Sequence, residues 1–146
     1  MKQLFVTLAL VAASVLSVEA QTKKSGAEFK FKEETYDFGT LKEGPVATHV
    51  FEFTNVGNEP LIIQNASASC GCTTPDWPKE PILPGKKGKI TVNYNTQGRV
   101  APFNKDVYIQ SNARMPEGKE RYELHIKGTV VAAENPAKPA DAKPNN

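Results

Sequence analysis

Cysteine, histidine and tryptophan are scarce in this 146-residue chain, which contains two, two and one of them. A tetrahedral zinc site needs more ligands than the cysteines supply. The two histidines, His49 and His125, have no metal-ligand spacing to each other or to the cysteines, and we interpret both as structural. No block of like charge occurs, and the net charge is +2. A nucleic-acid-binding surface would need clustered Lys and Arg, so none is expected.

Enzyme motifs are also missing. The chain has no G-x-S-x-G, Walker A, H-E-x-x-H or calcium-loop pattern. Ser67, Ser69 and Ser111 have no histidine at a spacing that would indicate a catalytic serine. We therefore expect no enzymatic activity, no cofactor and no metal.

The sequence has one long apolar run, from Leu4 to Leu16, which is shorter than the roughly 20 residues of a transmembrane helix. Lys2 precedes the run, and Val18-Glu19-Ala20 places small residues before Gln21. This arrangement is typical of a secretory signal peptide. We predict a signal peptide over residues 1–20 and an exported product, periplasmic or secreted, with no membrane span after cleavage.

Composition divides the remaining chain into three parts. Residues 21–27 lack large apolar side chains and are predicted to be a flexible N-terminal segment. Residues 132–146 are rich in Pro, Ala and Lys, cannot bury enough surface to fold, and are predicted to be a disordered tail. One folded domain is expected over residues 28–131.

The apolar residues of this domain alternate with polar ones. For example, Phe51 and Phe53 fall on one face of a strand, and Glu52 and Thr54 fall on the other. Alternation of this kind predicts strands that are buried on one face. Turn signals separate the runs, and long helix-forming connections are absent. The fold class predicted is all-β, an antiparallel β-sandwich of the immunoglobulin-like (Ig-like) type with about seven strands.

Two turns can be interpreted in more detail. Pro84-Gly85 suits the central positions of a type II turn. Asn55, Gly57 and Asn58 suit the positive φ that a hairpin turn often requires.

Five stretches together resemble a known family. They are YDFGTLKEG (36–44), HVFEFTNVGNEPLII (49–63), SCGCTTP (69–75), ILPGKKGKITVNY (82–94) and VYIQSN (107–112). In this order they resemble exported bacterial Ig-like domains that carry a Cys-Gly-Cys-Thr signature, a family catalogued as a domain of unknown function. That family is related to the major-sperm-protein-like and cilia-associated Ig-like domains. The resemblance implies an Ig-like sandwich with no established enzymatic activity, and it carries over Cys70 and Cys72 only as the signature pair.

Cys70 and Cys72 lie at positions i and i+2, so their side chains are neighbours on one face of an extended segment. A regular strand would separate their Cα atoms by about 6.5 Å, and Gly71 allows a closer approach. In an oxidising compartment a local disulfide is the first interpretation. The alternatives are a Cu(I) site, a thiol-redox pair and two free thiols.

The residues after the cysteines form a candidate binding loop of Thr73, Thr74, Asp76 and Trp77. Trp77 either packs over the disulfide as a lid or stays exposed as an anchor for a partner. We expect a non-enzymatic module that binds an unknown protein or cell-envelope partner. The alternative function is a periplasmic Cu(I)-binding or thiol-redox protein that uses Cys70 and Cys72.

Overall fold

The computed structural model describes residues 25–117, 119 and 121–133. These residues form eight strands: β1 (Phe29–Phe31), β2 (Thr35–Lys42), β3 (Val46–Asn55), β4 (Ile63–Ala68), β5 (Thr73–Asp76), β6 (Lys87–Asn95), β7 (Pro102–Ser111) and β8 (Tyr122–Val131). The expected signal peptide (1–20) and most of the expected terminal segments (21–27 and 132–146) lie outside the described residues. In the part that is described, no helix is long and apolar enough to cross a bilayer.

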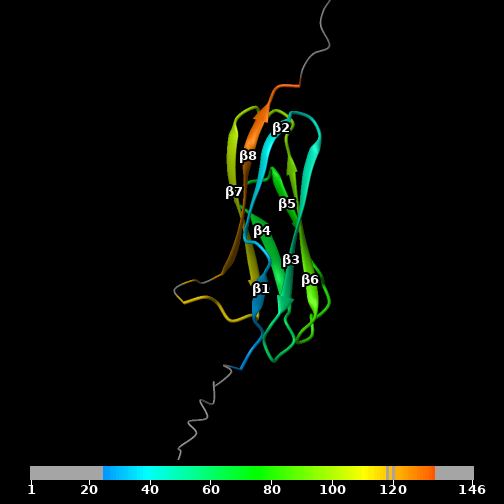
Figure 1. Cartoon of the computed structure of the whole chain (residues 1–146), viewed down its shortest axis with the longest axis vertical. Coiled ribbons are helices and arrows are strands. Elements are labelled where there is room, and N and C mark those ends of the chain that lie inside the picture. Colours follow the sequence, from blue (N-terminus) through cyan, green and yellow to red (C-terminus); the bar gives the residue numbers. More distant parts are fainter. Residues whose placement is uncertain (1–24, 118, 120, 134–146) are drawn as a thin grey trace, which may run out of the picture.

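The strands form two sheets of four, packed face to face in an elongated sandwich (Figure 1). The first sheet has the order β1-β3-β6-β5, and the second has the order β2-β8-β7-β4. The predicted all-β sandwich is confirmed, with eight strands where about seven were expected. The two shortest strands are β1, with three residues, and β5, with four.

One pairing departs from the expected antiparallel arrangement. Strand β2 pairs with β8 in parallel, from Thr35 opposite His125 to Lys42 opposite Val131. The physical reason lies in the short link between β1 and β2, which crosses from the first sheet to the second without reversing the chain. Gly39 (φ 64°) lies at an irregularity of this pairing, between Asp37 and Thr40.

The core lies between the sheets and follows the alternation in the sequence. Phe51 and Phe53 of β3 are buried, and the residues between and after them face outward. Aromatic rings fill much of the space, with Tyr94 of β6 stacked on Phe103 of β7 at 4.0 Å between ring centroids. Burying each such side chain contributes about 1.5–3 kcal/mol, so this layer supplies the main stabilisation.

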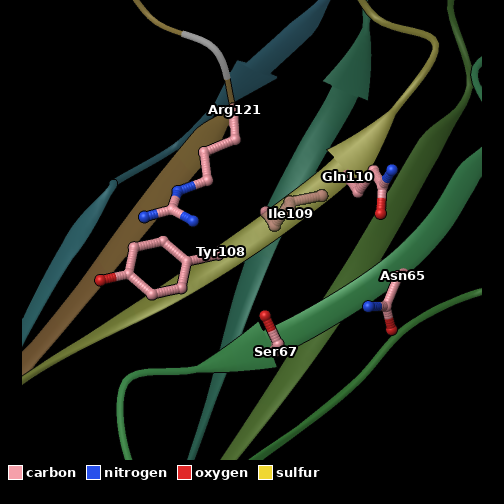
Figure 2. Close-up of a pocket in the computed structure, with 6 residues that line it drawn as sticks. All are labelled: Asn65, Ser67, Tyr108, Ile109, Gln110 and Arg121. Carbon is pink, nitrogen blue, oxygen red and sulfur yellow. The ribbon is translucent and has the colours of Figure 1, made fainter.

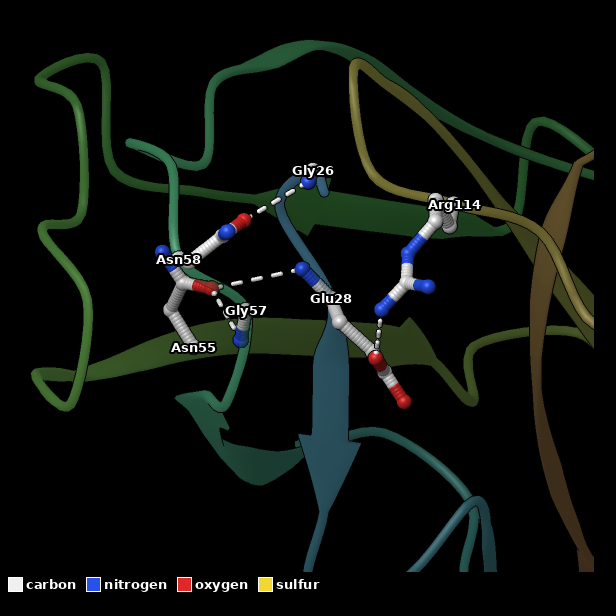
Figure 3. Close-up of polar contacts among 6 residues, drawn as sticks. All are labelled: Gly26, Glu28, Asn55, Gly57, Asn58 and Arg114. Atoms are coloured by element: carbon white, nitrogen blue, oxygen red, sulfur yellow. Dashed lines mark hydrogen bonds and ion pairs between the residues drawn. The ribbon is translucent and has the colours of Figure 1, made fainter. Parts of the chain in front are cut away.

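At one end of the sandwich, the turn after β3 is held by a fully buried amide. The Asn55 Oδ1 atom accepts hydrogen bonds from the backbone N–H of Gly57 (3.0 Å) and of Glu28 (3.3 Å), as Figure 3 shows. Its Nδ2 atom donates to the carbonyl oxygens of Glu59 and Ile82, each at 2.8 Å. One side chain therefore joins the turn, the N-terminal segment and the loop before β6.

The prediction of positive φ in this turn is wrong. Among the described residues no non-glycine has positive φ, and Gly57 is not one of the glycines that do. Gly57 is required for space, because a Cβ atom there would lie 2.2 Å from the carbonyl oxygen of Gly26. The type II turn at Pro84-Gly85 agrees with the structure, since Gly85 has φ +76°.

Candidate functional site

Cys70 and Cys72 are joined by a disulfide, with their Cα atoms 5.3 Å apart. The bridge lies between the end of β4 and the start of β5, where the chain passes from the second sheet to the first. Gly71 is exposed, and a Cβ atom added to it would meet nothing within 4 Å. The structure therefore contains the local bridge that headed the sequence-based alternatives, on a turn that is open to solvent.

Thr73 follows the bridge and is only 5% exposed. Its hydroxyl lies 3.5 Å from Cys70 Sγ and 3.8 Å from Cys72 Sγ. Its backbone N–H donates to the carbonyl oxygen of Cys70 at 3.3 Å. The hydroxyl and the backbone N–H of this buried residue are thus both directed at the cysteine turn.

Strand β5 is an edge strand, and its free edge is poorly suited to pairing with another strand. The N–H of Asn95 donates to the carbonyl of Cys72, so the antiparallel alternation turns the backbone groups of Thr74 toward β6. The backbone groups of Thr73 and Pro75 then face the free edge. The Thr73 N–H is already bonded and proline has none, which protects the edge from strand addition.

Trp77 is half-buried and packs against the hydrophobic core. The Lys79 ammonium lies 3.1 Å from the centre of its ring and 4.0 Å from an Asp76 carboxylate oxygen. The ring therefore packs within the domain, while the lid over the disulfide and the anchor for a partner both stay predictions. A partner-binding role for Thr73, Thr74, Asp76 and Trp77 stays a prediction.

The described residues contain no group of three or more His, Cys, Asp or Glu side chains that could hold a metal ion. His49 stacks on Tyr36, with 3.5 Å between ring centroids, and its Nε2 lies 3.0 Å from Glu33. His125 Nδ1 lies 2.7 Å from Asp106. Both sulfurs are bridged, and neither histidine belongs to a group of three or more possible ligands. The Cu(I) alternative therefore has no support.

A second site lies on the outer face of the second sheet. It is a shallow pocket of about 270 Å³, which we call the polar pocket (Figure 2). Its lining comes from β4, from β7 and from the residue before β8: Asn65, Ser67, Tyr108, Ile109, Gln110 and Arg121.

The pairing of β4 with β7 builds two rows of this pocket. Asn65 lies opposite Gln110, and Ser67 lies opposite Tyr108. The register of β4 shifts just before Asn65, which is an irregularity of the kind that redirects side chains at sheet edges. The polar pocket is therefore a product of strand register.

Arg121 closes one side of the polar pocket. Its guanidinium carbon lies 3.6 Å from the centre of the Tyr108 ring, and its Nε lies 3.6 Å from a Glu123 carboxylate oxygen. The Tyr108 hydroxyl lies 3.5 Å from Asp106 Oδ2. The ring and the guanidinium are thus positioned by neighbours, and the positive charge of Arg121 is balanced locally.

The other polar side chains of this pocket have donors and acceptors that a ligand could use. Within the described part of the chain, the side chains of Asn65, Ser67 and Gln110 make no hydrogen bond to the protein. An amide both donates and accepts, and so does a hydroxyl. The site offers mainly uncharged donors and acceptors, which match a neutral polar ligand.

The polar pocket was not expected from the sequence. Its residues come from three separate segments, and alternation marks them only as outward-facing. Nothing in one sequence says which outward residues become neighbours, because that depends on strand pairing and register.

The two-sheet topology, with its parallel β2–β8 pair and the disulfide turn between the sheets, defines an Ig-like β-sandwich domain. The chain belongs to the family described as a protein of unknown function (DUF1573), whose model matches residues 29–130. This confirms the resemblance that was inferred from the Cys-Gly-Cys-Thr signature. No curated protein matches the sequence.

Solved structures share the fold at low sequence identity. A protein of unknown function from Porphyromonas gingivalis W83 has a TM-score of 0.63 and 19% identity, covering 77% of this chain and 51% of its own. The PapD-like domain 7 of human CEP192 has a TM-score of 0.61 and 13% identity, covering 80% of this chain and 94% of its own. The VesB protease of Vibrio cholerae has a TM-score of 0.55 and 13% identity, covering 70% of this chain and 31% of its own. The chain thus spans about half of the P. gingivalis protein, and these likenesses concern the fold alone.

Proposed function

We propose that this chain is an exported, non-enzymatic binding module whose polar pocket holds a sugar group of a cell-envelope polymer. The observation that carries the proposal is the set of unpartnered side chains around the pocket. Asn65, Ser67 and Gln110 face one hollow and have no protein partner in the described residues. Hydroxyl-rich ligands need donors and acceptors of this kind on a prearranged surface.

The size and charge of the pocket support the same ligand class. Its volume of about 270 Å³ lies just below the range of roughly 300–1,000 Å³ that is typical of drug-sized ligands, so it suits one small group. Arg121 is paired with Glu123, which leaves little net charge for attracting an ion. Ile109 is the one aliphatic residue of the lining and is itself fully buried, so an apolar protein anchor fits less well.

Export is the second part of the proposal. It is supported by the apolar run from Leu4 to Leu16 behind Lys2 and by the Cys70–Cys72 bridge, since disulfides persist in oxidising compartments. Intact-mass and N-terminal peptide mass measurement of the protein recovered from the periplasm or medium tests this part. A mature N-terminus at Gln21 is the expected result, and full-length protein retained in the cytoplasm would contradict it.

Binding is tested by NMR titration of the labelled domain with neutral monosaccharides and with a soluble digest of peptidoglycan. Amide resonances of β4 and β7 around the polar pocket are expected to shift. Asn65→Ala and Gln110→Ala should each weaken binding about fivefold, because one hydrogen bond contributes about 1 kcal/mol. Exposed residues of the same types outside the pocket provide matched controls, and the Asn104→Ala and Gln97→Ala variants should bind normally.

Two outcomes would contradict the proposal. One is saturation without shifts around the polar pocket. The other is a protein partner whose binding is unaffected by Asn65→Ala and Gln110→Ala, which would move the function to another surface.

A further inference from the structure

We propose that the Cys70–Cys72 bridge is a reversible two-electron redox pair that a dithiol reduces, and that Thr73, Arg99 and Lys105 stabilise its reduced form. This inference is independent of the proposed saccharide binding. It rests on the access to the bridge and on the groups that surround it.

The two cysteine residues differ in exposure. Cys70 is half-buried, whereas Cys72 is only 7% exposed. The turn between them is open, because Gly71 is exposed and has no atom near the position of a Cβ. We therefore expect an incoming thiolate to attack Sγ of Cys70, the more exposed residue, with Cys72 Sγ as the leaving group.

The Thr73 hydroxyl is placed to stabilise a thiolate. It is buried, and its hydrogen-bonding contacts in the described structure are the two sulfurs at 3.5 and 3.8 Å. A disulfide sulfur is a weak acceptor, whereas a thiolate carries a full charge and accepts a stronger bond. The hydroxyl thus favours the reduced pair over the bridge.

A hollow of about 250 Å³ beside Cys72 adds positive charge. Arg99 and Lys105 line it together with Cys72, and among the described residues neither cation has a carboxylate partner. Tyr94 also lines this hollow; burial raises the pKa of its hydroxyl, and the Arg99 charge opposes the rise. The positive charges that line this hollow offset part of the cost of a thiolate on the buried Cys72.

The reaction balances as two exchange steps. A thiolate of the dithiol attacks Cys70 Sγ, the S70–S72 bond breaks, and Cys72 leaves as a thiolate while a mixed disulfide forms. The second thiolate of the dithiol then attacks the first sulfur of the same dithiol, which is bonded to Cys70 in the mixed disulfide. Cys70 leaves as a thiolate that takes up a proton. The dithiol is oxidised to a disulfide, and the protein gains two electrons.

The fold should survive this change. The bridge joins residues that are two positions apart, so it removes little conformational entropy from the unfolded chain. Cys72 belongs to the buried core, but most other core residues lie on the two sheets, so opening the bridge leaves most of the core in place. Reduction can therefore be reversible at constant fold.

The test is equilibrium titration with reduced and oxidised dithiothreitol, with the reduced fraction measured by alkylation and intact mass. Thr73→Val, which keeps the shape and removes the hydroxyl, should shift the equilibrium about tenfold toward the disulfide. Thr73→Ser should restore it. Thr74→Val is the matched control, since Thr74 is exposed and does not contact the sulfurs, and it should behave as wild type.

Arg99→Gln/Lys105→Gln should shift the equilibrium a further few-fold toward the disulfide, and added salt should reduce the difference from wild type. Circular dichroism of the reduced protein should match that of the oxidised protein. The proposal is overturned if Thr73→Val titrates like wild type, or if the bridge opens only when the domain unfolds. Saccharide binding that is equal in both redox states would leave the proposed function intact whichever way this test falls.

Discussion

Replacing Asn55 by alanine tests whether one buried amide holds an end of the sandwich together. The substitution removes four hydrogen bonds, to Glu28, Gly57, Glu59 and Ile82. A hydrogen bond contributes about 1 kcal/mol net, and a buried group left without a partner costs more. Because some of the four backbone groups can turn to water, we expect a loss of about 3 kcal/mol. For a domain of this size that corresponds to a decrease in Tm of about 15 °C.

Urea unfolding monitored by the fluorescence of the single tryptophan measures this loss, and circular dichroism supplies a second probe. Asn58 is the matched control, because it is exposed and accepts one hydrogen bond, from the Gly26 N–H at 2.8 Å. Asn58→Ala should therefore lower the free energy of unfolding by only about 0.5–1 kcal/mol. The reasoning is refuted if Asn55→Ala costs no more than Asn58→Ala.

Three further predictions concern packing and pH. Gly88→Ala should lower the free energy of unfolding by about 1–3 kcal/mol in urea titrations, because its Cβ would lie 2.3 Å from the buried Phe53 ring, whereas Gly71→Ala should change it by less than about 0.5 kcal/mol. Trp77→Ala should cost about 2 kcal/mol by the same assay, and no loss would return the ring to the role of a free anchor. Burial raises the pKa of the Tyr122 hydroxyl, so this hydroxyl loses its proton at lower pH in the unfolded chain than in the folded one. The free energy of unfolding should therefore be unaffected by this group below about pH 10 and should fall above it. Tyr122→Phe should reduce this fall at alkaline pH.

Strand positions and their buried faces could be predicted from the sequence, because burial on one face imposes a period of two. The alternation around Phe51 and Phe53 and the turn at Pro84-Gly85 are examples. The parallel pairing of β2 could not be predicted, since alternation carries no information on the direction of a neighbour. The glycine at position 57 was attributed to a positive φ, whereas the structure requires it for space beside Gly26. Crowding by a segment that is distant in the sequence leaves no local signal.

The same distinction between local and long-range features applies to the candidate sites. The cysteine turn is local, so the neighbouring sulfurs and the bridge between them could be anticipated from residues 70–72. The Thr73 contact to the sulfurs follows from a sharp turn whose geometry is not encoded in spacing. The polar pocket and the two cations near Cys72 depend on long-range register, which one sequence does not reveal.

The parallel pair of β2 with β8 has a consequence for how the chain acquires its structure. Thr35 of β2 pairs with His125 of β8, so β2 pairs with a strand some ninety positions later in the chain. Closing so distant a contact is slow, because loop entropy has to be overcome before the pairing stabilises anything. A polypeptide threaded through a pore with its N-terminus first therefore cannot complete its second sheet until β8 has emerged.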